Sequence, residues 1–310
     1  MSLGMRRILS WCCLLLVVHC GSFCEEALPY PRVSREAFEA RLPFFSYDKD
    51  IPLDGRIVLE KKEARAVRWK LVFRGAQGFL VPGYLEIPEG ARKPYPLVVL
   101  LHGWSGGKEN WWEEGNYISG SEMRTALIES GYAVLALDAC AHGERAHEID
   151  YLHVNPYEDP AAPPRRNYFS IAEIVIQTVK DHRRALDYME ERGDMDMSRV
   201  GLVGYSMGGV NTMLLLAIES RFKMGVACVP PWFNDAWRPV EPVDYTWGLG
   251  DKPLLMLMGR RDGFYTEGQI EASRRAYLNP DTTRTVWYDR DHKLAPDYVP
   301  DALAWVKKHL

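Results

Sequence analysis

The sequence predicts an α/β fold, in which a mostly parallel, twisted sheet carries helices on both faces and follows an N-terminal antiparallel hairpin. Three observations lead to this prediction. Apolar runs of strand length alternate with longer helical segments over most of the chain. One run, residues 96–101, is apolar throughout, as expected of a central strand buried on both faces. Another, residues 200–203, passes within a few residues through Gly204 and Gly208 into a helical segment.

The composition is that of a globular protein and excludes several classes. The 310 residues are 47% hydrophobic and 26% charged, which suits one large domain with a single core. The formal charge is −4 and no basic stripe stands out, so nucleic acid is not an expected partner. No Cys-x-x-Cys or His-Glu-x-x-His spacing occurs, so we expect neither a metal nor another cofactor.

The first 24 residues form a separate segment. Arg6 and Arg7 precede an apolar run, residues 8–18, and small or mixed residues follow up to Cys24. This order is typical of a secretory signal peptide, and the run is short for a membrane-spanning helix. We therefore expect residues 1–24 to be a signal peptide and the protein to be secreted or periplasmic, without stable membrane association. A retained membrane anchor is the alternative.

The rest of the chain divides into an arm and one domain. Residues 25–63 begin with a Pro-rich, irregular stretch and are predicted to form an arm laid over the domain. In the domain, residues 64–310, the alternating segment 64–74 predicts a strand with one buried face. Residues 78–88 are predicted to be its antiparallel partner, with a turn at Gly75.

Beyond residue 95, predicted strands and helices alternate. The strands are expected over residues 96–101, 132–137, 200–203, 224–229, 254–258 and 285–288. The helices are expected over residues 121–130, 169–192, 210–218, 269–277 and 300–309. Because crossover helices pack on the faces of a parallel sheet, both faces of this sheet should be covered.

One long segment interrupts the alternation. Residues 144–168, approximately, are rich in proline and show no periodicity. A loop of this length inside a compact domain is usually functional, and this one follows the C-terminal end of a predicted strand. We interpret it as a lid over the site.

The junction at residues 204–208 carries the main chemical signal. It reads Gly-Tyr-Ser-Met-Gly between a predicted strand and a predicted helix. Glycines let the chain reverse within a few residues and leave Ser206 strained and exposed beside a helix N-terminus. In this context Ser206 is the candidate nucleophile, and a turn serine without a catalytic role is the alternative.

A serine hydroxyl needs a general base, which needs an acid to orient it. In sites built on this strand–turn–helix junction, the acid and then the histidine follow the serine along the chain. After Ser206 the only histidines are His292 and His309, and His309 belongs to the last helix, so His292 is the predicted base. Asp262 follows a buried strand and is the predicted acid.

Two other carboxylates compete with Asp262. Asp289 and Asp291 share the loop of His292. The acid must reach the side of the imidazole that faces away from the serine, which favours a neighbouring loop and therefore Asp262.

Backbone N–H groups are expected to bind the developing oxyanion. One is that of Met207, the residue after the nucleophile. The other is that of Trp104, in the glycine-rich loop 102–107. We expect His102, His142 and Asp138 to brace loops rather than react.

Several tryptophans fall in loops at the C-terminal side of the predicted sheet, where ligands bind. Trp111, Trp232 and Trp237 are the candidate substrate contacts, since flat aromatic faces suit sugars or aromatic esters. Filling of the core is the alternative.

These residues together resemble the α/β-hydrolase superfamily, over nearly all of the chain after residue 64. The stretches 96–107, 181–190, 199–209 and 254–263 are similar to those of the dienelactone-hydrolase, acetyl-xylan-esterase and prolyl-oligopeptidase-like branch. Dienelactone hydrolases use a cysteine nucleophile, whereas this chain carries a serine, which points to ester cleavage.

The resemblance implies a strand order in which Cys140 and Cys228 follow strands that are three positions apart, roughly 14 Å at sheet spacing. A disulfide needs Cα atoms within about 7 Å. We therefore expect two buried thiols that form no disulfide.

The sequence thus predicts a secreted serine hydrolase that cleaves a short-acyl, acetyl-type carboxylic ester of a small molecule or carbohydrate through an acyl-enzyme. A prolyl-oligopeptidase-like peptidase is one alternative, although the arm before residue 64 is far too short for a propeller. A catalytically silent binding protein on the same fold is another, and nothing in a binding role requires a complete triad. A structural or adhesion protein is the third.

Overall fold

A computed structural model of the chain describes residues 32–146, 170–231, 239–276 and 280–310. The predicted signal peptide (1–24), most of the predicted lid (144–168), Trp232 and Trp237 lie outside these residues. Within the described part, no helix has the length and apolar character needed to cross a membrane.

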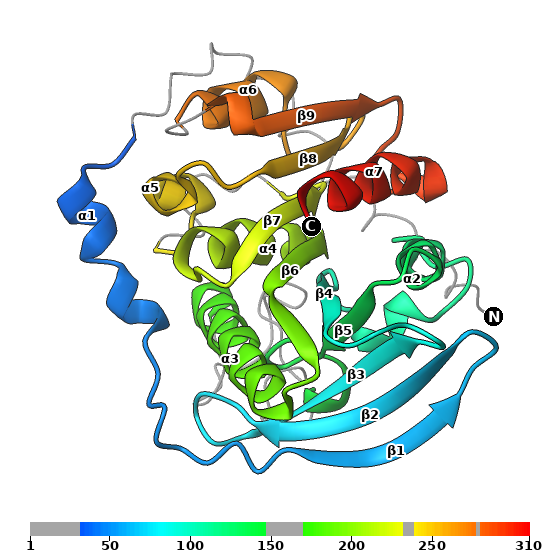
Figure 1. Cartoon of the computed structure of the whole chain (residues 1–310). Coiled ribbons are helices and arrows are strands. Elements are labelled where there is room, and N and C mark those ends of the chain that lie inside the picture. The colour runs from blue at the N-terminus through cyan, green and yellow to red at the C-terminus, as the bar shows by residue number, and fades with distance from the viewer. Residues whose placement is uncertain (1–31, 147–169, 232–238, 277–279) are drawn as a thin grey trace, which may run out of the picture.

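One twisted sheet organises the described residues (Figure 1). Its nine strands lie in the order β1-β2-β3-β5-β4-β6-β7-β8-β9. They are β1 (Arg56–Lys62), β2 (Ala66–Arg74), β3 (Leu80–Pro88), β4 (Tyr95–Leu101), β5 (Ala133–Leu137), β6 (Met195–Tyr205), β7 (Phe222–Cys228), β8 (Leu254–Gly259) and β9 (Thr283–Tyr288). The pairs from β1 to β5 are antiparallel and those from β5 to β9 are parallel, which confirms the predicted sheet.

Helices cover both faces of the sheet, as predicted. They are α1 (Arg35–Glu39), α2 (Gly120–Glu129), α3 (Ile171–Arg192), α4 (Met207–Ile218), α5 (Thr246–Leu249), α6 (Glu267–Arg275) and α7 (Val299–His309). In Figure 1, α2 and α7 lie together on one side of the sheet, and α3, α4 and α5 lie together on the other. The long helix α3 begins at a capping box of Ser170 and Glu173 and ends at Gly193, whose φ is +71°.

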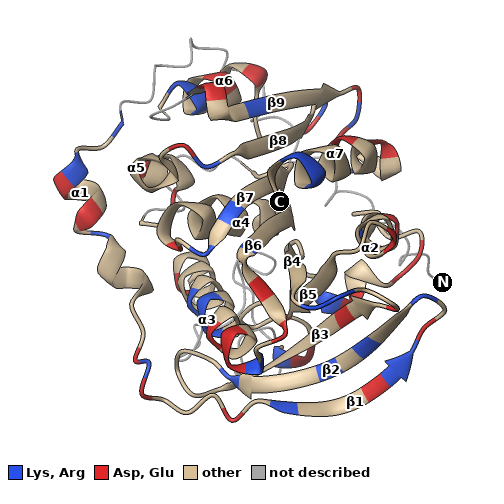
Figure 2. Cartoon of the chain, viewed as in Figure 1, with Lys and Arg blue, Asp and Glu red and all other residues tan. Residues whose placement is uncertain are grey.

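The core follows from this layering. Residues 97–101 of β4 and all of β5 are buried, so the apolar runs of the sequence do form central strands. Figure 2 shows that the strands in the middle of the sheet carry few charged residues, whereas β1 and β2, at one edge of the sheet, carry many. Cys140 and Cys228 are both buried and form no disulfide with each other, as predicted.

The edge strand β1 was not predicted. Residues 56–62 were assigned to the arm, yet they pair with β2. All seven residues of β1 are exposed, and its apolar residues, 57–59, follow one another instead of alternating with polar ones. Backbone pairing with β2 therefore creates this strand without the period-two pattern by which strands are recognised.

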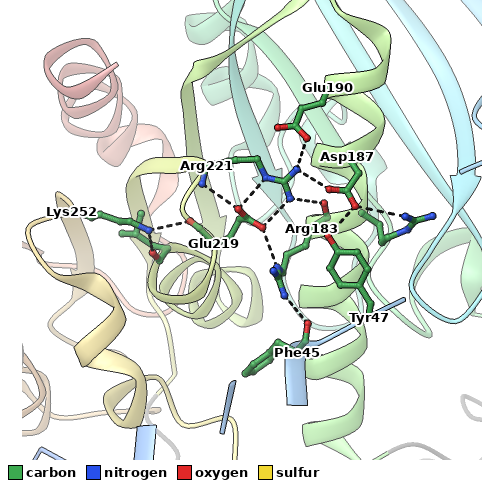
Figure 3. A network of polar contacts seen from close by, with 10 residues as sticks. Phe45, Tyr47, Arg183, Asp187, Glu190, Glu219, Arg221 and Lys252 are labelled. Carbon is green, nitrogen blue, oxygen red and sulfur yellow. Dashed lines mark hydrogen bonds and ion pairs between the residues drawn. The ribbon is translucent and has the colours of Figure 1, made fainter. Parts of the chain in front are cut away.

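The arm is fixed to α3 through backbone and side-chain contacts of residues 45–51, and Figure 3 shows those of Phe45 and Tyr47. Arg183 of α3 donates a hydrogen bond of 2.7 Å to the carbonyl oxygen of Phe45, and Tyr47 donates one of 2.9 Å to Asp187. Arg184 donates to the carbonyl oxygen of Ile51 at 2.6 Å. The arm is thus attached to the outer surface of α3 at three successive points.

Glu219 is the central acceptor of this network. Its side chain is 6% exposed and forms ion pairs with Arg183 at 3.0 Å and with Arg221 at 2.9 Å. Burial alone would raise the pKa of this carboxyl, but the hydrogen bonds and charge of Arg221 outweigh burial and lower its pKa from 4.5 to about 2. Arg221 also pairs with Asp187 and Glu190.

Replacing Glu219 with Gln should destabilise the fold in a pH-dependent manner. The pKa is lower in the folded than in the unfolded chain, so the unfolded chain binds more protons below pH 4.5 and the stabilisation declines as the pH falls. We expect E219Q to lower the free energy of unfolding by about 2–3 kcal/mol above pH 5. The difference from the parent should shrink as the pH approaches 3 in urea denaturation.

The matched control is E190Q, which removes an exposed partner of the same Arg221. Exposed pairs contribute little, so this variant should stay within about 1 kcal/mol of the parent. A difference between E219Q and the parent that is equal at pH 6 and pH 3 would contradict the assigned role of Glu219.

Candidate active site

Ser206 occupies the sharp turn between β6 and α4. Its φ and ψ are +55° and −118°, a conformation that residues with side chains rarely adopt. A side chain at Gly204 would collide with the carbonyl group of Gly208 across the turn. A side chain at Gly208 would collide with the carbonyl group of Leu101 at the end of β4. The two glycines of the motif are therefore required by close backbone contacts.

The structure brings Ser206, His292 and Asp262 together from three loops. Nε2 of His292 lies 2.9 Å from Oγ of Ser206, and its Nδ1 lies 2.7 Å from Oδ2 of Asp262. The Asp262 side chain is completely buried, and its Oδ1 accepts a hydrogen bond of 3.0 Å from the backbone N–H of Phe264. Because a carboxylate can only accept, Nδ1 donates to Asp262 and Nε2 is left to accept the serine hydroxyl.

The carboxylates of Asp289 and Asp291, the two competing candidate acids, have other partners than the imidazole of His292. Asp289 pairs with Arg261 at 3.3 Å and is largely exposed. Asp291 accepts a hydrogen bond of 2.8 Å from the backbone N–H of Lys293. Of the three candidate acids, Asp262 is the one that the structure places against His292.

Tyr205, the neighbour of the serine, positions the histidine loop. Its buried hydroxyl donates to the carbonyl oxygen of His292 at 2.9 Å and accepts from the N–H of Leu294 at 2.9 Å. The same residue that ends β6 therefore fixes the loop after β9. This contact was not predicted from the sequence. The Gly-x-Ser-x-Gly motif allows any residue before the serine, so nothing in the motif marks Tyr205.

The two predicted oxyanion donors lie in segments that meet at the serine. Met207 is the first residue of α4, where a backbone N–H has no acceptor within the helix. Trp104 follows Gly103, and a Cβ at Gly103 would lie 3.3 Å from the Cβ of Ser206. The loop after β4 therefore runs directly alongside Ser206.

His102 connects this loop to the loop after β5. Its Nε2 accepts a hydrogen bond of 3.0 Å from the N–H of Ala139, so Nδ1 carries the proton and donates to the carbonyl oxygen of Gly103 at 2.8 Å. Burial lowers the pKa of His102 to about 4, so the ring is neutral at neutral pH and keeps both bonds. His142 lies nearby, with its ring edge-on to Trp104 at a centroid distance of 4.9 Å.

A buried ion pair anchors the far end of the loop. Lys108 is completely buried, and its Nζ donates to Asp138 at 2.8 Å and to Glu144 at 2.6 Å. Asp138 also accepts from the backbone N–H groups of Lys108 and Glu144. Burial would lower the pKa of Lys108, but Asp138 outweighs this and raises its pKa, so the lysine stays charged. Asp138 thus braces loops as predicted, and Lys108 was not recognised from the sequence.

The fold and this arrangement agree with a family assignment. A model of the alpha/beta hydrolase family matches residues 98–307 of the chain. The chain belongs to the α/β hydrolase family. The match confirms the resemblance to the α/β-hydrolase superfamily.

The hydrolase is also similar to curated and solved proteins. It is 27% identical to the putative hydrolase YtaP of Bacillus subtilis (strain 168) over 150 residues, which cover 47% of this chain and 46% of that protein. The match thus spans about half the length of this curated relative.

Two solved structures share the fold. An acetyl xylan esterase from Paenibacillus sp. R4 is 17% identical, with a TM-score of 0.61 over 90% of this chain and 100% of that one. A putative dienelactone hydrolase from Klebsiella pneumoniae subsp. pneumoniae MGH 78578 is 21% identical, with a TM-score of 0.54 over 75% and 95%. At these identities the likeness concerns the fold.

One predicted substrate contact of this hydrolase is corrected by the structure. Trp111 was a candidate, but it lies in a short 3₁₀ helix (Lys108–Trp111) and is fully buried in the core, so it offers no face to a ligand. Phe264, which was not predicted, is 49% exposed and contacts the ring of His292 edge-on at 4.8 Å. Among the described residues, no group of three or more His, Cys, Asp or Glu side chains is arranged to hold a metal ion.

Proposed function

We propose that this α/β hydrolase is a secreted serine esterase that cleaves short-acyl, acetyl-type esters of small molecules or carbohydrates. The observation that carries the proposal is the position of His292, hydrogen-bonded to Ser206 on one side and to buried Asp262 on the other. A binding role requires no such chain of three side chains. The leader-like residues 1–24 support secretion.

The reaction follows from the hydrogen bonds. His292 takes the hydroxyl proton through Nε2 while Oγ of Ser206 attacks the ester carbonyl carbon. The carbonyl oxygen becomes an oxyanion that the N–H groups of Trp104 and Met207 stabilise. His292 then protonates the leaving alcohol, and an acyl group remains on Ser206.

Water completes the cycle. His292 removes a proton from a water molecule, which attacks the acyl carbon, and Ser206 leaves with the proton that His292 returns. Asp262 remains ionised throughout, holds the imidazole in the required tautomer and stabilises the imidazolium that forms twice per turnover.

The substrate class has two supports. The acetyl xylan esterase from Paenibacillus sp. R4 shares the fold over 90% of this chain. The segment predicted to be a lid contains Glu158, Asp159, Arg165 and Arg166 and few large aliphatic residues, which disfavours long acyl chains.

The orienting acid is tested by three Asp→Asn variants. D262N should lose about 10⁴-fold in kcat for p-nitrophenyl acetate, because the imidazole would be left without a carboxylate to set its tautomer. D289N and D291N should retain most of the activity, since neither carboxylate contacts His292. Thermal unfolding measured on each variant verifies that it is folded. The assignment is wrong if D262N stays within tenfold of the parent while one of the others collapses.

Acyl specificity is tested with p-nitrophenyl acetate, butyrate and octanoate and with acetylated xylo-oligosaccharides. We expect kcat/KM to fall at least about tenfold from acetate to octanoate. An added methylene contributes binding free energy only where an apolar pocket can bury it, and the polar segment predicted to be a lid offers few apolar side chains. The acetylated oligosaccharides should release acetate. Octanoate turned over much faster than acetate would overturn the short-acyl proposal and leave the esterase mechanism intact.

A further inference from the structure

Tyr117 lies beside the nucleophile although the motifs do not include it. It belongs to the loop between the 3₁₀ helix at Lys108–Trp111 and α2. A side chain at Gly103 would collide with the hydroxyl of Tyr117 and would lie 3.3 Å from the Cβ of Ser206. The phenol oxygen and the serine therefore flank the same small volume at Gly103, and the absence of a side chain there leaves room for both.

The ring of Tyr117 is held in place. It packs edge-on against Tyr205, with a centroid distance of 5.8 Å and an interplanar angle of 89°. The next residue, Ile118, is fully buried, and its carbonyl oxygen accepts a hydrogen bond of 2.8 Å from Tyr298. Since Tyr205 also holds the histidine loop, the phenol has a defined position relative to Ser206 and His292.

The hydroxyl of Tyr117 differs from those of its neighbours. The hydroxyls of Tyr205, Tyr265 and Tyr298 all form hydrogen bonds within the protein. For Tyr117, whose side chain is partly exposed, no such bond is found in the described part of the chain. Burial raises the pKa of Tyr117 to about 12, so the phenol keeps its proton at neutral pH and remains a donor.

We propose that Tyr117 donates a third hydrogen bond to the oxyanion, beside the backbone N–H groups of Trp104 and Met207. The inference rests on the proposed esterase function. As the bond between Oγ of Ser206 and the carbonyl carbon forms, the carbonyl π electrons move to oxygen and the serine proton moves to His292. The phenol keeps its own proton and stabilises the negative oxygen until the C–O bond to the leaving alcohol breaks.

The geometry favours the oxyanion over the leaving oxygen. Gly103, the residue that the phenol contacts, directly precedes Trp104, whose N–H is a proposed oxyanion donor. Proton delivery to the leaving oxygen is already provided by Nε2 of His292, which lies 2.9 Å from Oγ of Ser206. A donor next to Gly103 therefore supplements the two backbone groups.

The test compares Y117F with Y132F, using p-nitrophenyl, phenyl and ethyl acetate as substrates. Phenylalanine keeps the ring and its contact with Tyr205 and removes only the oxygen. Tyr132 lies at the N-terminal end of the parallel strand β5, whereas Ser206 lies beyond the C-terminal end of β6, so Y132F should match the parent. Because an oxyanion donor acts mainly in the transition state, Y117F should lower kcat about 10- to 100-fold with KM changed less than about threefold.

The loss should be equal for the three esters, since the oxyanion is the same whichever alcohol leaves. A kcat within threefold of the parent would overturn the proposal, and so would a loss confined to ethyl acetate, which would place the phenol at the leaving oxygen. A loss accompanied by a lower melting temperature or a larger KM would indicate a structural role and would also overturn it.

The outcome separates this inference from the proposed function. If the parent hydrolyses these esters, S206A does not, and Y117F matches the parent, then the esterase assignment stands and the role of Tyr117 is refuted. If the parent hydrolyses none of them, the proposed function fails and the inference fails with it.

Discussion

The close approach of α4 to the end of β4 is the constraint on which the site depends. The backbone at Gly208 lies against the carbonyl group of Leu101, where no side chain would fit. This contact sets the first turn of the helix beside the loop that follows β4, so Gly103 comes alongside Ser206. A bulkier residue at position 208 would push the first turn of α4 away from this loop and would separate Ser206 from Trp104, one of its two proposed oxyanion donors.

Loops that are proposed to supply backbone donors need to be rigid, and buried polar and charged side chains provide much of the rigidity here. The neutral ring of His102 bridges the loops after β4 and β5, and the buried pair of Lys108 and Asp138 joins the end of the first loop to the start of the second. Removing one partner of such a buried pair leaves an uncompensated charge, which typically costs several kcal/mol. Tyr205 provides the equivalent support on the histidine side. The rigidity that the proposed oxyanion donors require is thus built from side chains that have no part in the proposed reaction.

The sequence was sufficient for features that carry a local pattern. The apolar runs identified β4 and β5, and the two glycines around Ser206 identified the turn. Chain order and the scarcity of histidine then led to His292, which the structure places against Ser206. The predictions of β4, β5 and the turn rely on strand periodicity and backbone sterics, which act over a few residues, whereas that of His292 relies on the order of the three residues along the chain.

Features created by long-range packing could not be predicted. The exposed strand β1 has no buried face and no alternating pattern, and Trp111 gives no local sign that the core covers it. Tyr117 contacts Gly103 across a loop, and nothing in the intervening residues encodes that contact.

The most direct test of the central claim is labelling with a fluorophosphonate probe, followed by intact-mass measurement and peptide mapping. One adduct on Ser206, retained in S105A and lost in S206A, is the predicted result, whereas an adduct that persists in S206A would contradict the account.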